Sequence, residues 1–201
     1  MPMMLQGGPF KAPIAGLHRF TVKQYHKMIA DGVLTEDDRV ELLDGFLVEK
    51  MPHDPLHDGT VQLVEAAVST LLPNGWCVRV QSAITLSGSE PEPDLALVRG
   101  NKRSYLANHP TRASFGIVIE VSNTTLDSDR VDKGAIYAEA GLPEYWIVNV
   151  VDMQIEVFQQ PSGPATTPQY AVAQIYRRGD NVPFALDGQQ LGSIPVNDLL
   201  P

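Results

Sequence analysis

An apolar run near the middle of the chain, residues 116–121, is rich in β-branched side chains. It is too short to cross a membrane and is typical of a strand buried on both faces of a sheet. Alternation along such a strand predicts that Glu120 shares one face with Val118 and Ser122. Because an unpaired buried carboxylate costs on the order of several kcal/mol, Glu120 requires a cation, a proton or a special set of hydrogen bonds.

The pattern changes from strand to helix after a polar turn at residues 123–127. The stripe at i, i+3, i+4 and i+7 consists of Lys133, Ile136, Tyr137 and Ala140. A lysine therefore stands on the apolar side of the predicted helix. Gly141 and Pro143 mark its end, and residues 145–150 are expected to form the next strand. Strand, helix and strand of this length predict a crossover between two parallel strands.

Hydrophobic periodicity also predicts elements on both sides of this unit. Before it we expect a helix capped by Thr21 and ending near Ala30, a hairpin of residues 40–43 and 46–49 about Asp44-Gly45, and a helix over residues 56–72 with His57 on its inner face. The further strands are expected at residues 76–81, 83–86, 94–98, 154–159, 170–175 and 184–186. This order predicts an α/β fold of the mixed α+β kind, a mixed sheet with helices packed on it. Residues 1–18 are expected to form an N-terminal arm, and residues 19–201 a single domain.

Composition narrows the class of protein. The chain has 201 residues, of which 43% are hydrophobic and 19% charged, as in soluble globular proteins. We expect a cytoplasmic protein with no membrane partner, because there is no signal-peptide pattern in residues 1–11 and no apolar run of about 20 residues. Cys77 is the single cysteine, so an internal disulfide is excluded. The net charge of −9 argues against broad adhesion to nucleic acid, so a nucleic-acid partner would need a local basic patch.

Three side chains carry the candidate chemistry. Asp94 stands at the mouth of one predicted strand, Glu120 lies within a second, and Lys133 is on the helix that follows. Two carboxylates at adjacent strand ends offer hard oxygen ligands for Mg²⁺, or for Mn²⁺ in its place. Such an ion lowers the pKa of a bound water, and a neighbouring lysine orients that water or stabilises the transition state. The set suffices for hydrolysis of a phosphodiester.

The same residues resemble a known family. Pro93-Asp94 followed by Glu120-Val-Ser122 resembles the PD-(D/E)XK nuclease pattern. A longer set, spanning roughly residues 41–157, is similar to the Uma-type family of restriction endonucleases. Its members are Glu41-Leu-Leu-Asp-Gly45, His57, Pro93-Asp94, Glu120-Val-Ser122, Asp129, Lys133, Tyr137 and Gly141-Leu-Pro-Glu-Tyr-Trp-Ile-Val148. The resemblance implies a restriction-endonuclease-like fold, a central mixed sheet flanked by helices.

One departure from the superfamily pattern concerns its lysine. The pattern places lysine two residues after the glutamate, where this chain has Ser122, and the resemblance implies that Lys133 takes that role from the helix. It further implies Glu41 as an auxiliary acid. Substrate contacts are assigned to His57, Gln81 and Ser122. Gln81 is also a candidate for orienting water.

Structural alternatives exist for these residues. A salt bridge between Glu120 and Lys133 would account for both without catalysis, and Asp129 can form an i,i+4 pair with Lys133. Asp94 after a proline could cap a strand start. His57 could be an ordinary packed histidine, and Glu41 a solvated strand acid.

Two main functional hypotheses follow. The first is a Mg²⁺-dependent endonuclease that hydrolyses DNA phosphodiester bonds and acts as a homodimer, because one such site cuts one strand. The second is a catalytically silent nuclease-fold module that binds nucleic acid or protein, favoured by the acidic charge and by Ser122. A third reading is hydrolysis of another phosphodiester, such as RNA or a nucleotide. Neither a phosphate-binding glycine-rich loop nor a dinucleotide fingerprint is present.

Overall fold

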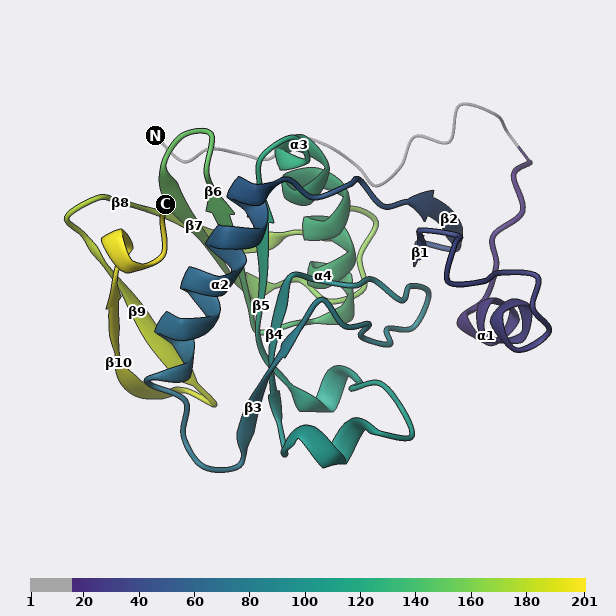
Figure 1. Ribbon diagram of the computed structural model, residues 1–201, viewed down its shortest axis with the longest axis horizontal. Coiled ribbons are helices and arrows are strands. Elements are labelled where there is room, and N and C mark those ends of the chain that lie inside the picture. Colours follow the sequence, from purple (N-terminus) through teal and green to yellow (C-terminus); the bar gives the residue numbers. More distant parts are fainter. Residues whose placement is uncertain (1–15) are drawn as a thin grey trace.

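The computed structural model describes residues 16–201 and is built around a six-stranded mixed sheet (Figure 1). In spatial order its strands are β3 (Trp76–Val80), β4 (Leu95–Arg99), β5 (Phe115–Ser122), β6 (Glu144–Asn149), β7 (Gln154–Pro161) and β8 (Tyr170–Arg177). Strands β5 and β6 run parallel, and the other neighbouring pairs are antiparallel. The predicted mixed sheet and its parallel crossover are therefore confirmed.

The crossover from β5 to β6 contains an unexpected change of helical pitch. It begins with the short α3 (Leu126–Ser128), continues as a π-helical turn over Asp129–Lys133, and ends as α4 (Gly134–Ala140). The predicted end of the helix is confirmed at Gly141, whose φ of 70° lies in the left-handed region that glycine adopts without strain. The stripe residues Ile136 and Tyr137 are buried as expected, but the π-helical turn was not predicted.

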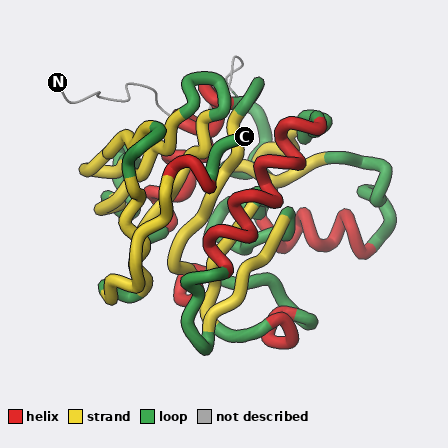
Figure 2. The backbone as a smooth tube through the Cα atoms, turned by 60° about the vertical axis from the view of Figure 1, so that its left-hand side comes forward, coloured by secondary structure: helices red, strands yellow, loops and turns green. Residues whose placement is uncertain are grey.

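The two faces of the sheet are covered by different elements. On one face, α2 (Pro55–Ser69) and the hairpin β9 (Asn181–Leu186)–β10 (Gln189–Pro195) pack against the sheet, and Figure 2 shows α2 lying across the strands. On the other face, α4 packs through Ile136 and Tyr137 against Val118 and Ile147. Side chains of β5 alternate between the two clusters, as the strand pattern predicts. Glu120 consequently points toward the face that carries α4.

The N-terminal elements lie to one side of the sheet (Figure 1). Helix α1 (Val22–Ala30) begins after the predicted N-cap Thr21, which also forms a capping box with Gln24. The predicted hairpin forms from β1 (Val40–Leu43) and β2 (Phe46–Glu49). A backbone hydrogen bond of 2.7 Å from the N–H of Glu90 to the carbonyl of Leu42 joins this hairpin to the segment that leads into β4. The bond fixes the position of Glu41 relative to the sheet.

Two sequence-based predictions were wrong in detail. Residues 83–86 do not form a strand of the sheet, although Ile84 and Leu86 are buried. Their N–H groups bond locally instead, to the carbonyls of Pro91 and Ser89, each at 2.9 Å. Strand β10 was missed because its sequence does not alternate, and its pairing contains an irregularity before Gly192. Most of the predicted arm, residues 1–18, lies outside the described residues.

The remaining helical segments are short. The described part of the chain contains 3₁₀ turns at Lys102–Tyr105, Arg112–Ser114 and Val196–Asp198. Within residues 16–201, none of the helices has both the length and the apolar character that crossing a membrane requires.

Candidate active site

The pairing of β4 with β5 brings Asp94 to Glu120. Leu95 is opposite Ile119 in this antiparallel pair, so one step further along the register Asp94 faces Glu120. The backbone N–H of Val121 donates to Asp94 Oδ2 at 2.8 Å, and the N–H of Asp94 points to Glu120 Oε2 at 3.4 Å. Two acids from distant parts of the sequence are thus neighbours because their strands are neighbours.

Lys133 joins these acids from the helical side. Its Nζ lies 3.0 Å from Glu120 Oε1, 3.7 Å from Asp129 Oδ1 and 3.8 Å from Glu41 Oε1. The Lys133 side chain is 14% exposed and the three carboxylate side chains are 4–8% exposed, so the cluster is shielded from bulk water. Both ion pairs that the structural alternatives proposed for Lys133 are present. They form one cluster with Glu41, which is buried rather than solvated.

Burial and the excess of carboxylates both shift the pKa values of Glu120 and Lys133. Burial, together with the nearby Asp129 and Asp94, raises the pKa of Glu120 to about 8, although Lys133 and a hydrogen bond from Tyr137 act in the opposite direction. The Tyr137 hydroxyl donates to Glu120 Oε1 at 2.7 Å. The surrounding carboxylates outweigh the effect of burial on Lys133 and hold its pKa well above the ordinary value. Lys133 therefore remains a cation.

His57 holds Asp94 from the other side. Asp54 caps α2 by accepting the backbone N–H of His57 at 2.8 Å, and this places the imidazole in the first turn, facing inward as predicted. His57 Nε2 lies 3.1 Å from Asp94 Oδ2. Burial alone would raise the pKa of Asp94, but the bonds from His57 and Val121 and the charge of Lys133 lower it. Asp94 is therefore held as a carboxylate.

Asp129 is the cluster member whose importance the sequence did not bring out. It accepts hydrogen bonds from Ser122 Oγ at 2.7 Å and Thr125 Oγ1 at 2.6 Å. The π-helical turn begins at Asp129 and ends at Lys133, which places both side chains on the inner surface. Its occurrence in the family pattern, one turn before Lys133, was the available signal.

A cavity of about 300 Å³ opens over these side chains. Four of the predicted catalytic and metal-binding residues line it together, as does His57; the four are Glu41, Asp94, Glu120 and Lys133. Two predicted substrate contacts lie elsewhere. Ser122 has no exposed surface, and its hydroxyl is bonded to Asp129 beneath the cavity. Gln81 is exposed and is not among the residues that line the cavity; its amide is 3.0 Å from Nδ1 of His53. In this conformation neither reaches the cavity.

The residues of the cavity suit a hard divalent cation. Among the described lining residues, seven carboxylates face two lysines, and a cation would offset that excess. Asp94 uses Oδ2 for its hydrogen bonds to His57 and Val121, and this leaves Oδ1 for a metal. Glu120 likewise bonds Lys133 and Tyr137 through Oε1. A pair of acid oxygens with few other partners is the donor set that Mg²⁺ prefers.

Comparisons with known proteins agree with this architecture. Residues 22–194 match the family model Uma2, described as "Putative restriction endonuclease". Among solved structures, the chain is similar to a "putative nuclease belonging to DUF820" from Anabaena variabilis, with a TM-score of 0.66 and 13% sequence identity. That match covers 90% of this chain and 97% of the other. A search of curated proteins finds no match. The structural likeness establishes a shared fold.

Proposed function

The chain belongs to the Uma2 family, and on this premise we propose that it is a metal-dependent endonuclease that hydrolyses DNA phosphodiester bonds. The observation that carries the proposal is the convergence on one cavity of acids from three separate segments with a buried lysine. Lys133 Nζ lies within 3.8 Å of Glu41, Glu120 and Asp129, and Asp94 adjoins Glu120 on the next strand. Burying several carboxylates together costs folding free energy, and a reaction that requires a bound cation would explain why the chain retains them.

Asp94 and Glu120 would hold Mg²⁺, or Mn²⁺, through the oxygens that their other contacts leave available. When bound, the ion supplies Lewis acidity that lowers the pKa of a water and offsets charge on the phosphate. Glu41 adds a third carboxylate at the same cavity, and its position is fixed because its Oε2 accepts the backbone N–H of Glu92 at 2.9 Å. Glu41 is accordingly an auxiliary acid.

Lys133 supplies an ammonium group in direct contact with the buried acids of the cluster. Its Nζ can donate hydrogen bonds to an attacking water or to a phosphoryl oxygen, and thereby orient the first or stabilise charge on the second. Tyr137 and Lys133 together fix the orientation of Glu120, while His57 fixes that of Asp94. These neighbours determine which carboxylate oxygens face the cavity.

The charge of the cavity makes its substrate binding dependent on a cation. Seven carboxylates against two lysines would repel a phosphate, so we propose that DNA enters only after the cation has bound. A single cavity accounts for cleavage of one strand, and we therefore propose a homodimer for cutting both.

Nicking of supercoiled plasmid in Mg²⁺ or Mn²⁺ tests the proposal. Asp94→Asn and Glu120→Gln should each reduce the nicking rate on the order of 100-fold or more. Glu144→Gln is a matched control, because Glu144 is also a buried strand glutamate but does not line the cavity. It should nick at close to the wild-type rate. Equal nicking by all preparations would identify a contaminant and overturn the proposal.

A second candidate is a catalytically silent binding module. It is favoured by the ion pairs that Lys133 already makes with three carboxylates, and by Ser122 at the usual lysine position. Calorimetric titration with Mn²⁺ separates the two, since a nuclease site must take up the ion. Absence of heat at millimolar Mn²⁺ together with absence of nicking would exclude the nuclease and favour the module. Nicking of RNA but not DNA would reassign the substrate.

A further inference from the structure

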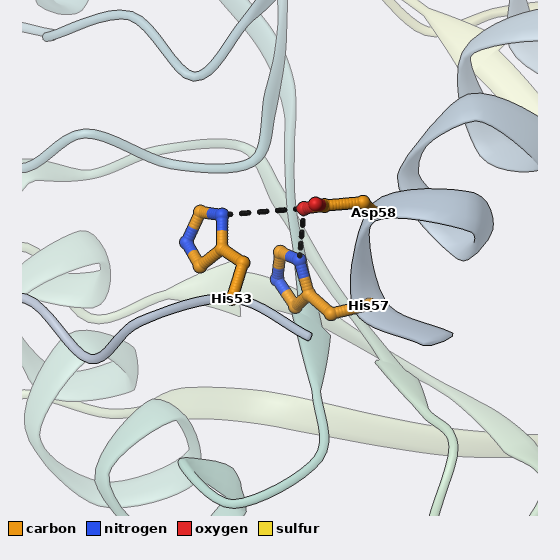
Figure 3. Close-up of side chains that lie close together, drawn as sticks. All are labelled: His53, His57 and Asp58. Atoms are coloured by element: carbon orange, nitrogen blue, oxygen red, sulfur yellow. Dashed lines mark ion pairs between the residues drawn. The ribbon is translucent and has the colours of Figure 1, made fainter. Parts of the chain in front are cut away.

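A second group of metal-ligating side chains lies at the start of α2, next to the acid cluster (Figure 3). His53 comes from the loop before the helix, and His57 and Asp58 from its first turns. Asp58 Oδ1 lies 3.5 Å from Nδ1 of His53 and 3.5 Å from Nδ1 of His57. The two imidazole rings are stacked with their centroids 4.2 Å apart. One carboxylate oxygen thus faces two ring nitrogens at equal distances.

These distances are too long for hydrogen bonds but suit a shared metal ion. An N–H···O bond has a donor–acceptor distance of about 2.7–3.2 Å, and His57 Nδ1 is buried without a hydrogen-bond partner. Ligands about 2.0–2.1 Å from a tetrahedral Zn²⁺ are about 3.3–3.4 Å from one another. The three ligand atoms lie within 4.8 Å of one another, so a bound ion would require a slight closing of the two 3.5 Å separations and an approach of the two imidazole nitrogens to a similar distance.

Hydrogen bonds set the tautomer of each ring so that Nδ1 carries no proton. His57 Nε2 faces the carboxylate of Asp94, which only accepts, so Nε2 carries the ring proton and the neutral ring has its lone pair on Nδ1. The amide nitrogen of Gln81 donates to His53 Nδ1 at 3.0 Å, so that nitrogen carries no proton, and a metal ion bound there would displace the amide. A metal-binding histidine commonly donates its other N–H to a carboxylate, as His57 does to Asp94.

We propose that His53, His57 and Asp58 form a binding site for a divalent first-row transition metal of the Zn²⁺ type. Two imidazole nitrogens favour such an ion over Mg²⁺ or Ca²⁺, which prefer oxygen ligands. Three protein ligands leave at least one position for water. The site is separate from the acid cluster, and the inference does not rest on the proposed nuclease function.

Binding would join two parts of the cavity wall. His53 belongs to residues 50–54, which line the cavity, and the ion would tie this loop to α2. It would also fix the tautomer of His57 in which Nε2–H donates to Asp94. Only one imidazole ring separates the ion from an acid of the candidate active site. The metal would therefore stabilise the wall and the orientation of Asp94 together.

Metal titration of the full chain, first freed of metal with a chelator, tests the site. Zn²⁺ affinity and the visible absorption of bound Co²⁺ are measured in excess Mg²⁺, which occupies the carboxylate cavity without competing for imidazoles. We expect one ion per chain. His53→Ala and Asp58→Ala, both at exposed side chains, should weaken binding at least tenfold. His109→Ala removes an exposed histidine outside the cluster and should leave it unchanged.

Two results would overturn the inference. The first is unaltered binding in His53→Ala and Asp58→Ala, or loss of binding only in Asp94→Asn and Glu120→Gln, which would assign the ion to the acid cluster. The second is no binding at micromolar Zn²⁺, the outcome expected if His57 is instead an imidazolium between Asp58 and Asp94. Because both readouts are independent of DNA cleavage, failure of the nuclease proposal would leave this test intact.

Discussion

Replacement of Lys133 by methionine should convert the acid cluster into one whose stability depends on a divalent ion. The substitution keeps an unbranched side chain but removes the cation 3.0 Å from Glu120, which is 4% exposed. Removing one partner of a buried ion pair costs about 3–5 kcal/mol. The loss should fall near the lower limit, because Glu120, whose pKa is already raised to about 8, can take up a proton.

The assay is thermal unfolding in a chelator and then in Mg²⁺. A loss of about 3 kcal/mol lowers the melting temperature by about 6–12 °C in a chain of this size. Mg²⁺ at about 100 times its dissociation constant returns about 2.7 kcal/mol if it binds the folded state alone. The variant in Mg²⁺ should therefore melt close to the wild type in chelator, and it should bind Mn²⁺ more tightly than the wild type because no ammonium group competes for the acids.

Lys27→Met is the matched control. Its ion pair with Asp31 is exposed, with Lys27 at 74%, and such a pair contributes at most about 1 kcal/mol. Adding Glu120→Gln to Lys133→Met should recover part of the loss, since it removes the carboxylate left without a partner. The reasoning would be refuted if Lys133→Met melted with the wild type in chelator, or if Mg²⁺ stabilised both proteins equally.

Three further predictions concern the surrounding fold. Gly116→Ala should destabilise the protein by about 1–3 kcal/mol in denaturant titration, because a Cβ would lie 2.7 Å from the Trp76 ring in the core; an unchanged midpoint would contradict this packing. Gly59→Ala should instead stabilise it by about 0.5–1 kcal/mol, since this exposed position within α2 has open space around its Cβ. Burial alone would raise the pKa of Glu156, but hydrogen bonding with Arg130 lowers it below the ordinary value of 4.5. The contribution of the Arg130–Glu156 pair to folding stability is therefore full above about pH 4.5 and is lost as the pH falls through the lowered pKa. The stability difference between wild type and Arg130→Gln should therefore shrink as the solution is acidified below pH 4.5, and a constant difference would argue against the pairing.

Local chemistry explains why much of the fold could be predicted. The Asp44-Gly45 turn, the Thr21 cap and the end of α4 at Gly141 each depend on the conformational preference of one or two residues. The crossover was predicted from the change in hydrophobic period, from two residues in the strand to about 3.6 residues in the helix that follows it. The strand predicted at residues 83–86 does not form, because apolar side chains determine burial but not the backbone partners; the N–H groups of Ile84 and Leu86 bond within the loop and that of Thr85 bonds the carbonyl of Pro110.

The candidate site was predictable in part, because two of the expected residues, Ser122 and Gln81, do not line the cavity. Pattern and family resemblance singled out Asp94, Glu120 and Lys133, and the sheet register brings the first two together. The Asp129–Lys133 pair followed from i,i+4 spacing, but the bonds of Asp129 to Ser122 and of Tyr137 to Glu120 depend on the pitch of the crossover helix, and no local sequence rule gives the π-helical turn. The burial of Ser122 also depends on the crossover helix, because the Ser122 hydroxyl has its hydrogen-bond partner only when that helix places Asp129 beside it.

The cluster around Lys133 also has a consequence for biosynthesis. Its carboxylates come from β1, the strands of the central sheet and the crossover, whereas the amine enters only with the segment before α4. A nascent chain still short of that segment carries acids without the group that offsets their charge. Fragments produced by interrupted translation or by proteolysis between β2 and α4 would likewise lack the assembled centre. Whatever reaction the centre performs is thus withheld until most of the polypeptide has been made and folded.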